Sequence, residues 1–506
     1  MLAASAAIAV TALWLLDAGP FEAEAPVDVA AISAAAAAAD SSDPLAYDPD
    51  EQARFERDAA VGLEHVLFEK SPDGVVRSAE RTTGYRSQIE AVAARYGTDP
   101  DLMEAMIFLE SGGRSEVIAG TDPAAASGLT QIVASTGLDL LEMPIDLEAS
   151  THLSSRIFTA ITRRSRLESG RADAPAKKMA ELARQIGALR RLEAQLRAQR
   201  IEVDARFDPE SALAGMGRYL EIAEQTFGRT DLAVQSYHMG IGNLTSVINR
   251  YLSPGDTSAP TADLVAANDL SYARIYFNSS PLRNPNTWAL LSGFADESLN
   301  YYWKVLAAER ILALYRDDRS ELDRLIALHG AKATAEEVFH PEDETEVFDD
   351  SEAIIDAYRR GDLVPISGGD AAGFRLANQL GELADQLGVD RELYRGLRPQ
   401  ALATLAYISG QTGAISGNRG SLIVTSAVRD RRYQEALLAI NPEATPEYSL
   451  HTTGWSFDIL RRYDSTAQAQ AFQFVLDRLR AYAIIDYAVE PTAIHITVSD
   501  RANRLR

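Results

Sequence analysis

The chain has 506 residues and a formal net charge of −24 at pH 7. This acidic balance argues against a nucleic-acid partner, because phosphate binding requires a basic face. Cysteine is absent, which excludes disulfides and thiolate metal sites, so a zinc site would have to use His, Asp or Glu ligands. The length is enough for about two to four domains.

An apolar run opens the sequence, in MLAASAAIAVTALWLLDAG. It extends from Leu2 to Leu16, which is shorter than the roughly 20 residues of a membrane span. The Ala-Glu-Ala at 23–25 has the small residues of a signal-peptide cleavage site. We therefore expect residues 1–25 to be a signal peptide, or alternatively a short membrane anchor, of a protein exported to the periplasm or cell surface. This segment is the one membrane contact that we expect.

Residues 26–50 are rich in Ala, Asp, Ser and Pro. Such a composition predicts a flexible tether. From about residue 52 to residue 330, apolar residues recur with helical spacing. We therefore expect a mostly α-helical domain over residues 51–335.

One helix of this domain is predicted to end in a glutamate. The stretch DPDLMEAMIFLESGG, 99–113, begins with an Asp-Pro start signal and ends with a Gly-Gly stop signal. Apolar residues recur at Met103, Met106 and Ile107, and Glu110 takes the next position on the same stripe. Burial there penalises the charged form, so we expect a raised pKa, which is what a general acid needs. The alternative is a glutamate that caps the helix or reaches into water.

The segment 156–206 stands apart within this domain. It includes KKMAELARQIGALRRLEAQLRAQR, in which leucine and isoleucine recur with helical spacing. This pattern predicts a protruding helical hairpin or short coiled coil. Its charges are expected to form a solvated face; the alternative is a surface that docks a protein partner.

Three further motifs follow Glu110 in the sequence. SGLTQI covers 127–132, SYHMGIG covers 236–242, and DESLNYYWKVL covers 296–306. Each of them alone fits a turn or a core aromatic residue. In this order after the glutamate, they resemble the motifs of the soluble lytic transglycosylase family, over roughly residues 85–312.

The resemblance implies a lysozyme-like fold and a peptidoglycan substrate. Members of this family cleave the β-1,4 bond between N-acetylmuramic acid and N-acetylglucosamine without water and without a cofactor. Glu110 would protonate the leaving oxygen and then accept the proton of the sugar's 6-hydroxyl as a 1,6-anhydro ring closes. Ordinary glycosidases need a second carboxylate, whereas here the sugar supplies its own nucleophile.

The same resemblance implies roles for residues around the acid. Tyr237 would donate a hydrogen bond to Glu110 and orient it, and its alternative is a core aromatic residue. Glu297 and a tyrosine at position 301 or 302 would belong to the closing helix of the family. His238 stands where the family usually has asparagine. The residues implied to contact the sugar are Ser111, Ser127, Gly128, Gln131 and Gly240.

A run with nine acidic residues in seventeen, EEVFHPEDETEVFDDSE, covers 336–352. Such a run cannot bury itself and is expected to be an acidic interdomain linker. Beyond it, a helical part is followed by short β-rich stretches such as LIVTSAV and AIHITVS. We therefore expect residues 353–506 to form a small α+β domain.

Two histidines and an aspartate in this domain have the pattern of metal ligands. His451 and Asp458 lie seven residues apart in SLHTTGWSFD, with a glycine between them. That spacing suits a strand and a turn rather than one face of a helix. His495 lies in a strand-like stretch, and two His with one Asp would leave the open fourth position of a catalytic zinc site.

These residues resemble the signature Ser-x-His-x-x-Gly-x-x-x-Asp of the D-alanyl-D-alanine metallopeptidases, over about 395–500. The resemblance implies a Zn²⁺ cofactor. Arg429 and Gln434 match the family's arginine and glutamine, of which the arginine binds substrate and stabilises the oxyanion. The family's general-base glutamate, three residues before the last histidine, is replaced by Thr492, and Glu490 lies five before it. Cleavage of stem peptides, binding without cleavage, and a purely structural polar cluster stay open as alternatives.

Both resemblances point to peptidoglycan. We therefore expect an exported, multidomain cell-wall enzyme, with a lytic transglycosylase domain followed by a domain that binds or cuts stem peptides. The alternative is a non-catalytic peptidoglycan-binding scaffold. Glu110 separates the two, because a pure binder has no need of a buried carboxylic acid.

Overall fold

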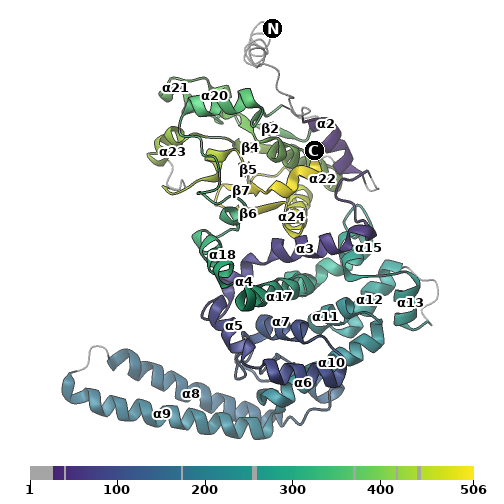
Figure 1. Cartoon of the computed structure of the whole chain (residues 1–506), viewed down its shortest axis with the longest axis vertical. Helices are drawn as coiled ribbons and strands as arrows, with labels where there is room; N and C mark the ends of the chain where they lie inside the picture. Colours follow the sequence, from purple (N-terminus) through teal and green to yellow (C-terminus); the bar gives the residue numbers. More distant parts are fainter. Residues whose placement is uncertain are drawn as a thin grey trace. The chain divides into compact units, whose positions relative to one another are not determined.

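The computed structural model describes most of the chain, in the ranges 27–38, 42–171, 175–252, 259–367, 372–417, 420–440 and 446–506. The signal peptide or anchor expected for residues 1–25 lies outside these ranges. Within them, no helix combines the length and the apolar character that a membrane span requires. The protein is mostly helical with a small sheet near its C-terminus (Figure 1), which confirms the expected fold class in this coarse form.

Two compact units are interleaved along the chain. Unit 2 combines residues 66–272 with 291–322. Unit 1 takes in the chain before residue 66, the segment 273–290 and everything from residue 323 onward. This division differs from the predicted boundaries, which assigned all residues from 51 to 335 to one domain.

Helices make up unit 2 in the residues that the structure describes. They are α4 (His65–Lys70), α5 (Val75–Thr83), α6 (Arg86–Tyr96), α7 (Pro100–Ser111), α8 (Leu147–Arg171), α9 (Ala176–Val203), α10 (Pro209–Phe227), α11 (Thr230–Met239), α12 (Ile241–Leu252), α13 (Thr261–Ala267), α16 (Ala295–Leu299) and α17 (Tyr301–Asp317). α7 packs against α6 and α17, and α10 packs against α6 and α11. The predicted glutamate helix, α7, is therefore central to this unit.

The ends of α7 follow its sequence signals. The side chain of Asp99 accepts a hydrogen bond from the Asp101 backbone N–H, and Pro100 occupies the first turn. Gly112 ends the helix in the left-handed conformation, with φ 57°, which glycine adopts without strain. Met103 and Met106 are fully buried on the predicted core stripe. The predicted helix and its buried face are thus confirmed.

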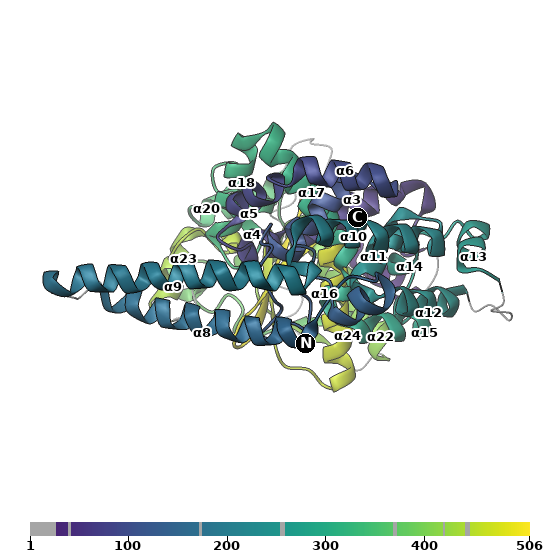
Figure 2. The same cartoon turned by 90° about the horizontal axis from the view of Figure 1, so that it is seen from below.

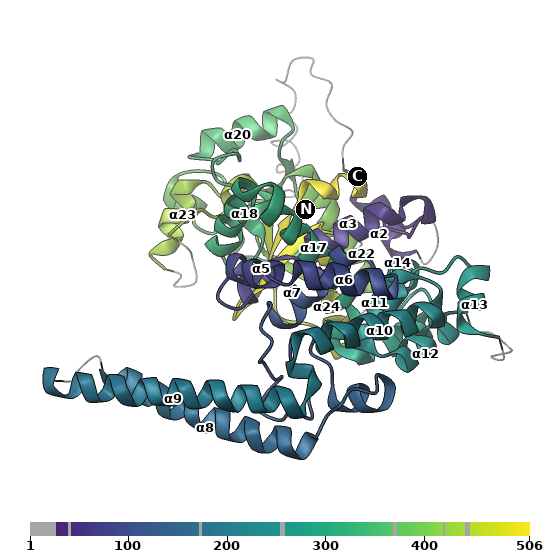
Figure 3. The same cartoon turned by 60° about the horizontal axis from the view of Figure 1, so that its bottom comes forward.

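The insert predicted at 156–206 is a long helical hairpin formed by α8 and α9. It begins earlier than expected, at Leu147, and ends at Val203. Its seam contains the buried side chains of Leu153, Ile157 and Leu196. Figures 2 and 3 show the two helices side by side, extending away from the other helices of unit 2.

Unit 1 contains a five-stranded sheet in the order β2-β4-β5-β7-β6. The strands are β2 (Phe374–Leu376), β4 (Leu422–Ser426), β5 (Ser456–Leu460), β6 (Ile485–Val489) and β7 (Ala493–Val498). β2 and β4 run parallel, and the other neighbours are antiparallel. A second, two-stranded sheet pairs β1 (Val364–Pro365) with β3 (Gly396–Leu397).

Unit 1 also contains helices. They are α2 (Val29–Ala37), α3 (Gln52–Leu63), α14 (Tyr272–Phe277), α15 (Pro285–Leu291), α18 (Arg319–Ala331), α19 (Glu336–Phe339), α20 (Ser351–Arg360), α21 (Ala384–Leu387), α22 (Pro399–Ser416), α23 (Arg431–Leu438) and α24 (Thr466–Ala481). α22 and α24 pack on each other, and they contact β7 and β6 respectively. The alternation of β7 buries Ile494, Ile496 and Val498 completely or nearly so, which leaves His495 on the opposite face of the sheet.

The tether expected at 26–50 is wrong for the part that the structure describes. α2 packs along α22 and buries Ile32 and Ala36. After α2, Leu45 is 3% exposed and its carbonyl accepts a hydrogen bond from the Tyr482 phenol at 2.9 Å. The average composition did not predict this packing, because a few apolar side chains are enough to attach an alanine-rich segment to a core.

The acidic segment 336–352 also belongs to unit 1 and does not join two separate bodies. Glu336 and His340 are both 5% exposed, and Phe348 is fully buried in a hydrophobic cluster. The Phe348 backbone N–H donates to the Thr452 carbonyl at 2.8 Å. The expected linker is therefore wrong, because its few apolar and buried polar side chains anchor it while most of its carboxylates face solvent.

Candidate functional sites

Glu110 lies in the last turn of α7, on the wall of a groove within unit 2. The groove has a free volume of about 280 Å³. Its lining includes Phe108 from α7, His238 from α11, Glu297 from α16 and Tyr301 from the start of α17. The Glu110 side chain is half-buried, so the carboxyl meets the groove from an apolar helix end.

The surroundings of Glu110 favour its protonated form. The Tyr301 phenol donates a hydrogen bond to Oε1 of Glu110 at 2.7 Å. Burial raises the pKa of Glu110 to about 7; the Tyr301 hydrogen bond opposes this shift and the nearby Glu297 carboxylate adds to it. Near neutral pH this side chain therefore exists in both protonation states, as a residue that gives and takes back a proton requires.

The hydrogen bond to Glu110 comes from Tyr301, so the expected orienting role of Tyr237 needs correction. A phenol has one proton to donate, and Tyr237 donates it to the Thr130 carbonyl at 2.7 Å. The rings of Tyr237 and Tyr301 stack at 6.3 Å.

Burial and the Glu110 charge both raise the pKa of Tyr237 well above its usual value. Tyr237 thus supports Tyr301 and remains close to the acid. The sequence signal for Tyr301 was the tyrosine of the closing motif.

Two serines expected to contact sugar have structural roles. Ser111 is 2% exposed and its hydroxyl donates to the Ile107 carbonyl at 3.3 Å. Ser127 is fully buried and its hydroxyl donates to the Ala125 carbonyl at 3.1 Å. Both hydroxyls are therefore engaged with backbone carbonyls. The contact expected of Ser127, like that of Gly128, is through its backbone and stays a prediction.

The three other residues of that group shape backbone turns. Gly128 has φ +81°, and a Cβ there would lie 1.8 Å from the Arg206 carbonyl oxygen, so only glycine fits. Gln131 is half-buried and its amide donates to the Gly128 carbonyl at 2.8 Å. Gly240 ends α11 with φ 88°. They fix the paths of two loops of unit 2.

A buried ion pair that was not predicted from the sequence holds the loop 123–132, which contains the SGLTQI motif. Arg206 and Asp204 are both fully buried and lie 2.7 Å apart. The Arg206 guanidinium also donates to the carbonyls of Pro123, Ala125 and Ile132 at 2.7, 3.2 and 3.1 Å. Both charged residues follow directly after α9, where their charge alone predicted a solvated surface.

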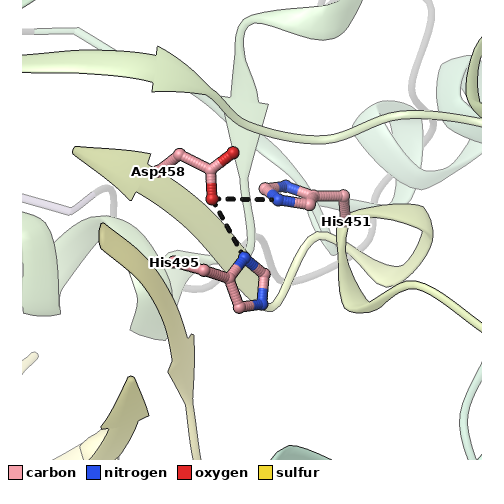
Figure 4. Close-up of side chains that lie close together, drawn as sticks. All are labelled: His451, Asp458 and His495. Carbon is pink, nitrogen blue, oxygen red and sulfur yellow. Dashed lines mark hydrogen bonds and ion pairs between the residues drawn. The ribbon is translucent and has the colours of Figure 1, made fainter. Parts of the chain in front are cut away.

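The three predicted metal ligands meet in unit 1 (Figure 4). Oδ1 of Asp458 lies 3.2 Å from Nε2 of His451 and 2.9 Å from Nδ1 of His495. One ligand atom from each residue falls within 4.8 Å of the others. Asp458 on β5 pairs directly with His495 on β7, and His451 lies in a short 3₁₀ turn, Leu450–Thr453. The predicted strand-and-turn arrangement of a candidate metal site is thereby confirmed.

Gly454 makes the turn between two of these ligands possible. It has φ +78°, and a Cβ at this position would lie 2.6 Å from Leu363 Cδ2. A side chain would therefore be strained and would also clash. This glycine lets the chain reverse between His451 and Asp458, so that both side chains reach the same point.

The electrostatics of this cluster favour a cation. Burial and the Arg429 charge lower the pKa of His451 to about 4. Although burial opposes it, the two histidines hold the pKa of Asp458 well below its usual value. Burial likewise opposes the shift at His495, but Asp458 and Glu336 raise its pKa to about 10. The ionised Asp458 carboxylate and the neutral His451 imidazole are donors that Zn²⁺ binds, and His495 would release a proton to join them.

Arg429 and Gln434 come together beside the candidate metal ligands. The Arg429 guanidinium donates to Oε1 of Gln434 at 2.9 Å and to the Ser426 hydroxyl at 2.5 Å. It lies 3.6 Å from Oδ2 of Asp458. Burial lowers the pKa of Arg429, and Asp458 and Glu490 oppose this shift. The arginine is therefore held rigidly next to the candidate metal site.

Glu490 lies at the end of the β6–β7 hairpin, near the same arginine. Its backbone N–H donates to the Ala493 carbonyl at 3.0 Å, and Ala488 pairs with His495. Because side chains alternate along a strand, Glu490 is on the same face of the sheet as Ala488 and His495. Thr492, at the position of the family's general base, is exposed in the connecting turn.

Each of the two sites departs from the motif that it resembles, at His238 and Met239 in unit 2 and at Thr492 in unit 1. In the groove, His238 replaces asparagine; it is exposed, stacks on Tyr301 at 5.3 Å and places Nδ1 2.9 Å from the Ser298 hydroxyl. In unit 1, Thr492 replaces the general base. No protein-family model matches this chain, and no curated protein matches it either.

Proposed function

We propose that this protein is an exported peptidoglycan lytic transglycosylase, whose second site binds or cleaves stem peptides. The observation that carries the first part is Glu110, a half-buried carboxyl on a groove wall whose pKa is raised to about 7. A group of this kind can donate a proton near neutral pH and accept one again. The motifs around it are similar to those of the lytic transglycosylases, whose substrate is the glycan strand.

The proposed reaction needs one carboxyl. Glu110 gives its proton to the glycosidic oxygen as the bond from that oxygen to the anomeric carbon breaks. The sugar's 6-hydroxyl oxygen then bonds to the anomeric carbon, and its proton passes to the Glu110 carboxylate. The acid is thereby restored and no water is consumed. General acid–base catalysis of this kind contributes roughly 10²- to 10⁴-fold to the rate, and the Tyr301 hydrogen bond keeps the carboxyl in one orientation throughout.

For the second site we propose Zn²⁺ held by His451, Asp458 and His495. A zinc ion in such a site polarises a carbonyl group. Arg429, fixed by Gln434, is placed to bind an anionic or carbonyl oxygen of a peptide, and Glu490 is a carboxylate on the same face of the sheet. The substrate class follows from the resemblance to D-alanyl-D-alanine metallopeptidases.

A non-catalytic peptidoglycan-binding scaffold is the second candidate. The exposed Thr492 favours it for the C-terminal site, because threonine cannot act as the carboxylate base of the family. On this alternative the hairpin α8–α9 is the surface that recruits a protein partner.

The decisive experiment is a digest of purified peptidoglycan, analysed by mass spectrometry. Wild type is compared with Glu110→Gln and with the control Glu221→Gln, a carboxylate of α10 that is not part of the groove lining. We expect anhydro-muropeptides from wild type and the control only. Products with reducing ends would show hydrolysis and contradict the lyase; binding without products from any variant would support the scaffold.

The second activity is tested in the same digests with His451→Ala and Glu490→Gln. Cut stem peptides from wild type but from neither variant would support a zinc peptidase with Glu490 as its base. Loss of cutting in His451→Ala alone would assign the base elsewhere. Uncut peptides with wild type would leave a binding site.

A further inference from the structure

His495 presents its two ring nitrogens to two different carboxylates. Nδ1 lies 2.9 Å from Oδ1 of Asp458, and Nε2 lies 3.1 Å from Oε2 of Glu336. Figure 4 shows the Nδ1 side of the ring turned toward the other ligands, with the second nitrogen on the far side. Glu336, the first residue of α19, comes from the acidic segment whose composition predicted a solvated linker.

Glu336 lies beside the nitrogen of His495 that would keep its proton when an ion binds to the other nitrogen. A neutral imidazole carries one proton, and a ligand nitrogen must be the unprotonated one. An ionised carboxylate only accepts hydrogen bonds, so without an ion Asp458 beside Nδ1 and Glu336 beside Nε2 each favour a proton on the nitrogen that they face. An ion at the Nδ1 position would replace the proton there, and Glu336 would keep the remaining proton on Nε2. That tautomer has its Nδ1 lone pair facing His451 and Asp458. The Thr497 hydroxyl, 3.3 Å from the same Nε2, can donate or accept and so does not select a tautomer.

His451 is arranged in the same way. Its outer nitrogen, Nδ1, lies 2.9 Å from the Ala427 carbonyl oxygen, which can only accept a hydrogen bond. The proton is therefore favoured on Nδ1, and Nε2 faces Asp458 at 3.2 Å. Both histidines thus have an acceptor on the outside, and with an ion bound each would present a lone pair on the inside, as metal-binding histidines do.

Glu336 is itself fixed in place. Its other oxygen, Oε1, lies 2.6 Å from Nζ of Lys332. The Ala335 backbone N–H donates to Oδ2 of Asp486 on β6 at 2.6 Å, which ties the start of α19 to the sheet. The ion pair with Lys332 and the contact with His495 hold the carboxylate in one position against the ring.

We infer that Glu336 is a positioning residue of the metal site, which accepts the Nε2 proton of His495 and thereby presents Nδ1 to the ion. This inference rests on the proposed metal site. Glu336 bonds to the ring nitrogen that points away from the other ligands, so it does not replace the missing general base. Glu490, on the same face of the sheet as His495, remains the candidate for the general base.

The test is zinc affinity of the full chain, measured by competition with a chromophoric chelator. Outer hydrogen-bond partners of metal-binding histidines contribute about 10- to 100-fold to affinity. We expect Glu336→Ala to weaken Zn²⁺ binding by that amount. Glu336→Gln should lose less, because its amide oxygen still accepts a hydrogen bond. The control Glu337→Gln removes a neighbouring charge, whose Oε1 lies 3.7 Å from Nζ of Lys332. This variant should bind zinc as wild type does.

A second measurement separates positioning from a general loss of stability. With Co²⁺ as the probe, visible absorption reports the geometry of the ligands around the ion. We expect the bands to change in Glu336→Ala and to stay as in wild type in Glu337→Gln. Unchanged bands together with a lowered melting temperature would assign Glu336 a structural role only and overturn the inference.

The outcomes distinguish this inference from the proposed site. If wild type binds zinc tightly, His451→Ala does not, and both Glu336 variants bind as wild type does, the inference is wrong and the site stands. If Glu336→Ala does not fold, unaltered affinity in Glu336→Gln overturns the inference. If wild type and His451→Ala bind equally weakly, there is no metal site and the inference fails with it.

Discussion

At the scale of single residues, Glu110 lies between two groups that act on its proton in opposite directions. The Tyr301 hydrogen bond lowers the pKa of Glu110 and the Glu297 charge raises it. Tyr301→Phe should therefore move the basic limb of the pH–rate profile to higher pH, and Glu297→Gln should move it to lower pH. Initial rates of muropeptide release between about pH 5 and 9 measure both shifts. Shifts in the same direction would contradict the assignment of Glu110 as the acid.

The raised pKa of Glu110 also affects folding stability. Below the usual glutamate pKa of 4.5 the group is protonated in the folded and unfolded chain alike; as pH rises toward 7 the unfolded chain loses the proton first, so the folded state loses stability. The full shift corresponds to at most about 3 kcal/mol, and solvent in the groove reduces it. The free energy of unfolding of Glu110→Gln, relative to that of wild type, should thus increase as the pH rises from about 4.5 to 8. Denaturant unfolding at the two pH values measures this difference. An unchanged difference would show that the pKa is not raised.

The role of a residue could be predicted from the sequence where it follows from local helix geometry. It could not be predicted where it follows from a contact between distant parts of the chain. Spacing alone placed Glu110 on the buried stripe of its helix, because helix geometry is local. The hydrogen-bond donor to it was not predictable, since Tyr237 and Tyr301 are adjacent only in the folded unit and Thr130 decides which one is free to donate. Glu336 was overlooked for the same reason, because a partner 159 residues away leaves no local pattern.

At the scale of elements, the loop of the second motif depends on a buried ion pair. Arg206→Ala would leave the Asp204 charge buried without its partner and remove three hydrogen bonds to loop carbonyls. Breaking a buried pair costs about 3–5 kcal/mol. We expect that loss in the free energy of unfolding, measured with urea. As a control, Arg77→Ala breaks an exposed pair with Glu80 and should cost about 1 kcal/mol or less; equal effects would contradict the structural role of Arg206.

Elements with strong local signals were predictable, and those attached by a few contacts were not. α7 has its start and stop signals, the hairpin α8–α9 has a long helical period, and the metal ligands lie on a strand and a turn. The segment of α2 and the acidic segment were predicted as mobile because their average composition is alanine-rich or acidic. Ile32 and Phe348 are each buried in unit 1. One buried apolar side chain of this kind is enough to hold several polar neighbours against the core, whatever the average composition of the segment.

At the scale of the whole molecule, unit 1 depends on its N-terminal segment. α2 packs on α22 and α3 packs on α24, and Asp58 of α3 pairs with Arg501 and Arg504 at 3.2 and 3.1 Å. A fragment of residues 323–506 would expose the surfaces of α22 and α24 that these helices cover. We expect it to be insoluble or aggregated in size-exclusion chromatography, and to be rescued by co-expression of residues 27–65. A monomeric, stable 323–506 fragment would contradict this dependence.

The interleaved order of the units has a consequence for synthesis in the cell. All segments of unit 2 have been synthesised once residue 322 is added, and they leave the ribosome as the following residues are made, so this unit can fold while the chain is still growing. The helices α2 and α3 are among the first parts made, yet their partners α22 and α24 follow more than 300 residues later. At about 5–20 residues per second, these two helices wait on the order of a minute with their apolar faces uncovered. A chaperone that holds the early segment is therefore expected to affect the yield of unit 1 far more than that of unit 2.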